Sequence, residues 1–267
     1  MRANRQRRLA RRGVTGSSPL PGGKAFAGSK ERRHAQPAEP ALPEAPGGAP
    51  ATPEEILVIA CGALARELHA IRQANGWRHL RIRCLDARLH HRPALIPGRL
   101  REEIARARGR YSRIFVAYAD CGTYGEIDRL LAAEPDIERL PGLHCYEFFA
   151  GESRFQRLSG EEPGTFYLTD FLVRFFDRFV LGALMLDRHP ELLESYFGNY
   201  RRAVYLSQTR DADLLASARR AAVTLRLDFH HVHCGFGALE TSLGAFAGTG
   251  SGHPSAPGRE ICRIAAG

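Results

Sequence analysis

The chain has 267 residues, of which 44% are hydrophobic, 9% aromatic and 25% charged, which argues against a wholly disordered, collagen-like or coiled-coil protein. Its net charge of +9 is concentrated in residues 1–53, which hold ten Lys and Arg against three Asp and Glu, leaving 28 against 26 for the remainder. This near balance argues against specific nucleic-acid binding, and the longest strongly apolar run, residues 179–186, falls far short of the ~20 residues of a membrane-spanning helix.

The composition predicts three segments. Residues 1–53 contain eight of the 16 prolines and no buried apolar face, which is typical of a disordered basic tail. We expect a single α/β domain over residues 54–246 and a flexible C-terminal tail over residues 247–267. The six cysteines occur without an apolar export signal, which favours reduced thiols in a soluble, cytoplasmic protein.

Apolar runs and helical repeats alternate through the first half of the domain. Short apolar or alternating runs predict strands, and apolar residues three or four apart predict helices. In chain order we expect a strand at 56–60, a helix at 63–74, a strand at 80–85, a helix at 99–108, a strand at 114–119, a helix around 127–131 and a strand at 143–146.

The second half opens with a longer helical stretch. An apolar stripe runs from Leu168 to Phe179, and Pro190 and Gly198 suit the start and the end of a second helix. Strands at 203–206 and 227–232 then flank a helix at 211–225. This alternation predicts an α/β fold: an open three-layer, mostly parallel sheet of about five or six strands with helices on both faces and a helical insertion near residues 165–200.

Cysteine and histidine residues follow several of these strands. Because ligands of parallel sheets bind at the carboxyl ends of the strands, we expect Cys61, Cys121 and one of His144 or Cys145 to meet at one edge. Three such ligands with one open position form a catalytic zinc site, in which bound water loses its proton near neutral pH. We therefore predict zinc or another transition metal there.

Two other interpretations of these cysteines stay open. Free cysteine is among the most buried residue types, so the thiols could simply pack in the core. Alternatively one of them is a thiolate nucleophile, with Cys121 favoured because a helix follows it.

Further residues complete the candidate site. Glu147, Asp120 and Asp170 are the candidate catalytic acid/base groups, although Asp170 also suits the N-cap of a helix. The backbone at Gly122, Thr123, Gly235 and Gly237 lies between a strand and a helix, where it can approach a phosphate or carboxylate of a cofactor, and ordinary tight turns are the alternative. The pairs His90-His91 and His230-His231 are interpreted as solvated or loop residues.

The separated blocks Cys61-Gly62-Ala63-Leu64, Asp120-Cys121-Gly122-Thr123, Pro141-Gly142-Leu143-His144-Cys145-Tyr146-Glu147-Phe148 and Tyr196-Phe197-Gly198-Asn199-Tyr200 resemble the domain of unknown function 1638 family. The resemblance covers most of residues 56–246 and implies no established activity. It implies an association with corrinoid-dependent methyl transfer and one-carbon metabolism.

Two functional hypotheses result. In the first, the chain is a small-molecule enzyme with a zinc or thiolate site at the sheet edge, linked to one-carbon or corrinoid methyl transfer. In the second, it is a non-catalytic accessory protein that binds a corrinoid, a metal or a methyltransferase partner.

Overall fold

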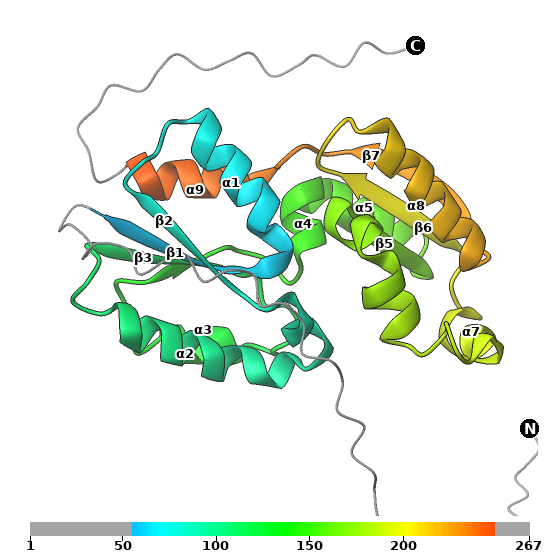
Figure 1. Cartoon of the computed structure of the whole chain (residues 1–267), viewed down its shortest axis with the longest axis horizontal. Coiled ribbons are helices and arrows are strands. Elements are labelled where there is room, and N and C mark those ends of the chain that lie inside the picture. Colours follow the sequence, from blue (N-terminus) through cyan, green and yellow to red (C-terminus); the bar gives the residue numbers. More distant parts are fainter. Residues whose placement is uncertain (1–54, 249–267) are drawn as a thin grey trace, which may run out of the picture. The chain divides into compact units, whose positions relative to one another are not determined.

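The computed structural model describes residues 55–248, so the expected tail at 1–53 and all but the first two residues of the expected tail at 247–267 lie outside the described residues. The parallel α/β class is confirmed, because every strand pair in the described part is parallel. The strands are divided over two sheets instead of one, with the orders β2-β1-β3-β4 and β5-β6-β7 (Figure 1).

The first sheet is built on β1 (Ile56–Cys61), all six residues of which are buried. Its neighbours are β2 (Leu80–Leu85) and β3 (Arg113–Ala117), and the short β4 (Glu138–Arg139) forms the edge. The helices α1 (Ala65–Ala74) and α9 (Ala238–Gly248) cover one face, and α2 (Ile96–Ala107) and α3 (Glu126–Leu131) cover the other (Figure 1).

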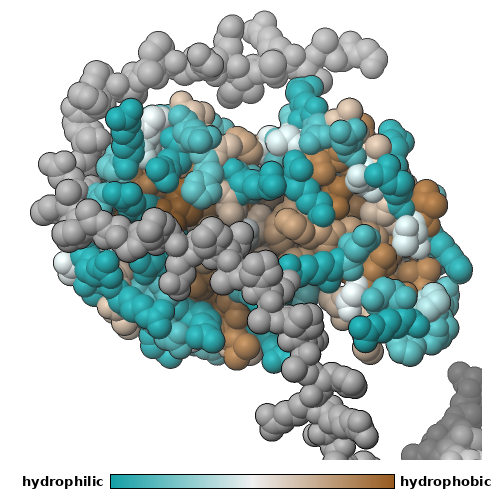
Figure 2. Space-filling model, in the orientation of Figure 1, coloured by the Kyte–Doolittle hydropathy of each residue, from teal (hydrophilic) through white to brown (hydrophobic). Residues whose placement is uncertain are grey.

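The helices of this sheet are amphipathic. In α2, Ile96, Leu100 and Ile104 recur every four residues and are buried, because this spacing returns a side chain to the same helix face. Figure 2 shows the corresponding outer surfaces of α1 and α2 as largely hydrophilic. Burial of the apolar face against the strands therefore holds these helices in place.

The second sheet contains β5 (Thr165–Thr169), β6 (Arg202–Ser207) and β7 (Asp228–His233). Alternate residues of β5 and β6 enter two apolar clusters: one contains α8 (Ala212–Thr224) and α6 (Asp170–Arg174), and the other contains Phe155 and Leu158 of α5 (Glu152–Glu161). Since helices cover both faces, this sheet is also a three-layer unit.

Three predicted elements differ from the structure. Residues 143–146 were expected to form a strand but begin the helix α4 (Cys145–Ala150), because a short apolar run does not distinguish a strand from a buried helix. The expected insertion at 165–200 begins with β5, whose faces are both covered. The apolar stripe from Leu168 to Phe179 is also not part of one long helix. It runs through the end of β5, α6 and the beginning of a π-helical turn (Asp177–Gly182), and the 3-10 turn Pro190–Leu192 and α7 (Leu193–Phe197) come later in the chain.

Two helices link the sheets. Phe148 and Phe149 of α4 belong to the core of the first sheet, whereas Ala150 packs in a cluster of the second. After β7 the chain returns through α9, whose Leu239 and Leu243 are fully buried in the first core. This helix ends at Gly248, two residues beyond the expected domain boundary. No helix in the described part is long and apolar enough to span a membrane.

Candidate functional site

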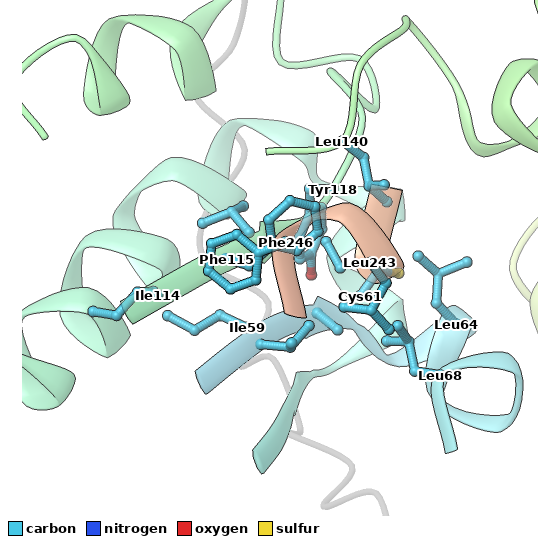
Figure 3. Close-up of a cluster of buried hydrophobic side chains, with 14 of the residues drawn as sticks. Ile59, Cys61, Leu64, Leu68, Ile114, Phe115, Tyr118, Leu140, Leu243 and Phe246 are labelled. Atoms are coloured by element: carbon cyan, nitrogen blue, oxygen red, sulfur yellow. The ribbon is translucent and has the colours of Figure 1, made fainter. Parts of the chain in front are cut away.

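Cys61 ends β1 within the buried core of the first sheet (Figure 3). The turn Gly62–Leu64 follows directly, and the backbone N–H of Ala63 donates to the Cys61 sulfur at 3.3 Å. Gly62 is required here, since a Cβ would lie 2.6 Å from the Leu85 carbonyl oxygen. The thiol is therefore held where a strand gives way to a helix.

The ring of His90 lies beside this thiol. Its Nδ1 is 3.6 Å and its Nε2 3.9 Å from the Cys61 sulfur, and Nδ1 is 3.2 Å from the Ala87 carbonyl oxygen. His90 also lies nearly parallel to the ring of Tyr118, with 6.5 Å between centroids. His90 lies in an irregular segment, as expected, but it is not solvated: the 3-10 turn Ala87–His91 after β2 places it half-buried at the site.

The second cysteine, Cys121, lies in the tight loop that follows β3. Cys121 and Tyr124 both adopt a left-handed backbone conformation with φ 53°. Residues other than glycine rarely adopt it. The backbone N–H groups of Asp120 and Cys121 donate to the carbonyl oxygens of Gly142 and Leu143, at 3.0 and 2.9 Å. These bonds attach the loop to the segment that leads into α4.

Asp120 holds this loop in shape. Its carboxylate accepts hydrogen bonds from the Thr123 hydroxyl (2.9 Å) and from the N–H groups of Gly125 (2.7 Å) and Tyr124 (3.1 Å). Burial opposes the charged form, but these donors together lower the pKa of Asp120 below its ordinary value. Asp120 and Thr123 thus bond to one another and to the loop, and a Cβ at Gly122 would lie 3.5 Å from Pro93 Cγ.

The start of α4 distinguishes His144 from Cys145 as the third candidate ligand. His144 is exposed at the N-cap position, whereas Cys145 is half-buried and packs against the first core. Glu147 accepts the Leu143 N–H at 2.8 Å, an arrangement that caps a helix. Of the two ligand candidates at this position, Cys145 therefore packs against the same core as Cys61 and Cys121.

The three thiols interact electrostatically. Burial raises the pKa of Cys61 well above its ordinary value, and Cys121 and Cys145 raise it further. Burial also raises the pKa of Cys121 to about 12 and raises that of Cys145, with Cys121 adding to the latter. All three are therefore neutral thiols at neutral pH. Among residues 55–248, no group of three or more His, Cys, Asp or Glu side chains is already arranged to hold a metal ion.

Two buried polar groups at this cluster were not anticipated from the sequence. Across the described residues, only Glu67 Oε2 and the Tyr118 hydroxyl are buried side-chain oxygen or nitrogen atoms without a hydrogen-bond partner. Tyr118 interacts electrostatically with Cys61, and Glu67 with Cys145. A signal existed for Glu67, because it shares the apolar face of α1 with Leu68 and Ile71. Unpartnered buried groups are costly, and they gather at functional sites.

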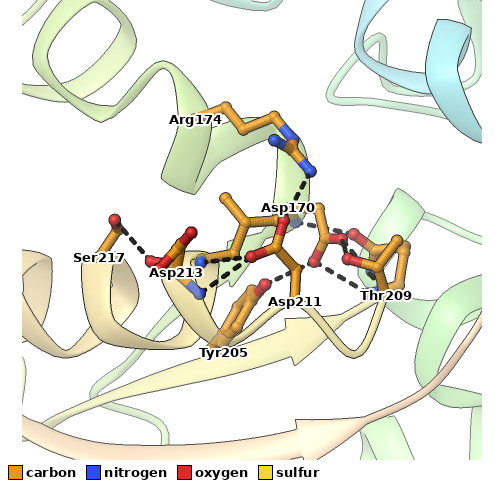
Figure 4. Close-up of polar contacts among 9 residues, drawn as sticks. Asp170, Arg174, Tyr205, Thr209, Asp211, Asp213 and Ser217 are labelled. Atoms are coloured by element: carbon orange, nitrogen blue, oxygen red, sulfur yellow. Dashed lines mark hydrogen bonds and ion pairs between the residues drawn. The ribbon is translucent and has the colours of Figure 1, made fainter.

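Asp170 occupies the edge of the second sheet (Figure 4). It accepts the Tyr205 hydroxyl at 2.6 Å, the Gln208 N–H at 3.0 Å, and both the N–H and the hydroxyl of Thr209, at 3.0 and 2.5 Å. The N-cap of α6 is Thr169, whose hydroxyl accepts the Leu172 N–H, so the N-cap interpretation of Asp170 is wrong by one residue. Asp170 joins β5 to the end of β6.

The remaining candidates lie after β7. Gly235 has φ +61° and open space around the position of a Cβ. At Gly237 a Cβ would collide with the carbonyl oxygens of Phe148 and Phe149, so close packing of α4 accounts for this glycine. Ser207 ends β6 at the same edge, and its hydroxyl lies 2.9 Å from His231 Nε2 and 3.0 Å from His233 Nδ1.

Comparison with known proteins gives one match. The family model described as "Protein of unknown function (DUF1638)" matches residues 84–243, more than half of the chain. The matched region contains Cys121, Cys145 and Asp170 and begins after Cys61 and Glu67. No curated protein and no solved structure matches the chain. The chain belongs to the DUF1638 family, as the resemblance of its sequence blocks predicts.

Proposed function

We propose that the protein is an enzyme that acts on a small molecule through the thiol of Cys61, with His90 as the general base. The contact between the Cys61 sulfur and the His90 ring carries this proposal. A cysteine beside an imidazole and at the start of a helix is the usual arrangement of a catalytic thiol.

The hydrogen bond to Ala87 defines the direction of proton transfer. A carbonyl oxygen only accepts, so the contact between His90 Nδ1 and the Ala87 oxygen gives Nδ1 the proton and leaves Nε2 as the base. Burial lowers the pKa of His90, which keeps the ring neutral and able to accept a proton at neutral pH. The Cys61 proton then passes to Nε2, and the Ala63 N–H stabilises the thiolate.

The reaction class that we assign is transfer of an alkyl group, with a methyl group as the first candidate. The thiolate of Cys61 forms the new S–C bond, the bond from that carbon to its leaving group breaks, and the leaving group departs with the electron pair. Support for a methyl group comes from the family resemblance, which implies one-carbon and corrinoid chemistry. The buried position of Cys61 also suits a small electrophile.

Alkylation of the full chain by iodomethane, followed by peptide mass spectrometry, tests this proposal. We expect His90→Gln to slow methylation of Cys61 by about 10²-fold, the ordinary contribution of a general base. The exposed Cys84 is the control within the same molecule, and its rate stays constant. Equal rates at Cys61 with and without His90, or methylation of Cys84 alone, would refute the role of the pair.

Zinc binding is a second candidate, favoured by the mutual interaction of Cys61, Cys121 and Cys145. A divalent cation would compensate the loss of the thiol protons, and thiolates are strong zinc ligands. Cysteine has a single side-chain torsion, so rotation about the Cα–Cβ bond is the movement that would turn the sulfurs toward one ion. Elemental analysis of reduced protein should then find one zinc per chain, lost in both Cys61→Ser and Cys121→Ser. Protein that stays metal-free after incubation with zinc excludes this candidate.

A non-catalytic accessory role is the other alternative, favoured by two exposed apolar side chains near Cys121. Tyr124 is 88% and Leu143 64% exposed, and both belong to the loops that the Cys121 backbone joins. Exposed aromatic and aliphatic groups suit a corrinoid or a methyltransferase partner in the cytoplasm. Stoichiometric binding of a corrinoid without turnover would identify this role.

A further inference from the structure

A cavity lies between α6 and the π-helical turn that follows it on one side and α8 on the other. Its volume is about 450 Å³, within the ~300–1,000 Å³ of small-molecule sites and many times the ~30 Å³ share of one water. A bare inorganic ion would leave most of this volume unfilled. The size therefore favours an organic ligand.

The chemistry of the wall is divided between apolar and cationic groups. Val173, Phe176 and Ala221 are buried and supply apolar lining, and the partly exposed ring of Phe175 adds an aromatic surface. Three arginines, Arg174, Arg178 and Arg220, also line the cavity together with one acidic residue, Asp177. Guanidinium groups bind carboxylate and phosphate groups through paired hydrogen bonds.

Existing contacts orient these groups but leave donors for a ligand. Arg220 donates one N–H to the Ser217 hydroxyl oxygen at 2.8 Å, and Arg174 lies 3.5 Å from Asp211. The hydroxyls of Ser217 and Thr224 donate to the carbonyl oxygens of Asp213 and Arg220 in their own helix. Each guanidinium has five N–H donors, so Arg174 and Arg220, and not the two hydroxyls, have donors left for an anion.

The backbone on one side of the cavity is also unusual. Asp177 and Arg178 begin a π-helical turn, Asp177–Gly182, a rare conformation that occurs often at functional sites. The wider turn places both side chains in the lining.

We propose that this cavity binds a small organic anion, in which a phosphate or carboxylate group contacts Arg220 and Arg174 and an apolar or aromatic body lies on Val173, Phe176 and Phe175. The Asp177 carboxylate accepts a hydrogen bond from a hydroxyl or amine of the same ligand. This site is separate from the Cys61 site and does not depend on the proposed thiol chemistry.

Calorimetric titration of the full chain tests this proposal with phenyl phosphate, benzoate, inorganic phosphate and phenol. We expect phenyl phosphate or benzoate to bind at least tenfold more tightly than inorganic phosphate and phenol, because only these two probes join the anion to an aromatic body. Arg220→Gln should weaken that binding about tenfold or more.

Arg219→Gln is the matched control, because Arg219 belongs to the same helix but lies over the Phe229 ring, 4.8 Å from its centroid. Binding in this variant should remain unchanged. Equal loss in the Arg219 and Arg220 variants would mean non-specific attraction to a basic surface and would overturn the proposal. The proposal would also be overturned if inorganic phosphate bound as tightly as phenyl phosphate, or if neither organic anion bound at millimolar concentration.

Discussion

Glu67 should make the stability of this protein depend on pH near neutrality. Its side chain is buried on α1, with 5% of the residue exposed, and Oε2 has no hydrogen-bond partner among the described residues. Burial raises its pKa to about 7, and the nearby Asp170 raises it further, whereas Arg174 acts in the opposite direction. Folding therefore favours the protonated acid.

The size of the effect follows from the two pKa values. With an unfolded value of 4.5 and a folded value of about 7, the folded protein holds more protons than the unfolded chain between these pH values, so stability falls as pH rises. Each pKa unit corresponds to about 1.4 kcal/mol of unfolding free energy, so the full effect is about 3 kcal/mol. Roughly 2.5 kcal/mol of it is lost between pH 5 and pH 8.

Urea denaturation of the wild-type protein and of Glu67→Gln at pH 5, 6, 7 and 8 measures this loss. Glutamine keeps the shape of the side chain but does not titrate, so the difference between the two unfolding free energies should change by about 2.5 kcal/mol over this range. Glu240→Gln, an exposed substitution on α9, should give a nearly constant difference from wild type.

A parallel pH dependence in wild type and Glu67→Gln would refute the reasoning. The Glu67 carboxylate would then keep its ordinary charge in the folded protein, stabilised by a group that the static structure does not place beside it.

Four further substitutions test the packing around the site by thermal or urea unfolding. Gly237→Ala should lower the free energy of unfolding by about 3 kcal/mol or more, because its Cβ collides with the α4 backbone. Gly235→Ala has open space around its Cβ and should lower it by only the ~1–2 kcal/mol of a left-handed alanine. Equal losses in the two variants would disprove the close approach at Gly237. Asp170→Asn should cost about 3 kcal/mol, because an amide cannot accept all four hydrogen bonds, and a change below ~1 kcal/mol would contradict this. Leu243→Ala should cost about 2–5 kcal/mol if α9 completes the first core, and an unchanged midpoint would show that it does not.

Local pattern was sufficient for the class of fold and for part of the site. The spacing of apolar residues predicts which segments are strands and which are helices. Strands that alternate with helices along the chain favour parallel pairing. Cys61 and Cys121 follow neighbouring parallel strands, whose carboxyl ends meet at one edge. The sequence alone therefore predicts that these two thiols lie at one edge.

Contacts between distant segments decided the rest. Short apolar runs such as residues 145–150 suit either a strand or a buried helix, and only packing against both sheets makes this one α4. The division into two sheets depends on which strands pair, a choice made by contacts between residues far apart in the sequence. His90 reaches Cys61, 29 residues away, from a short 3-10 turn that has no repeat to recognise. Spacing along the chain determined the elements of this protein, whereas the partners of Cys61, Glu67 and Asp170 were decided by tertiary packing, because burial and proximity exist only once the chain has folded.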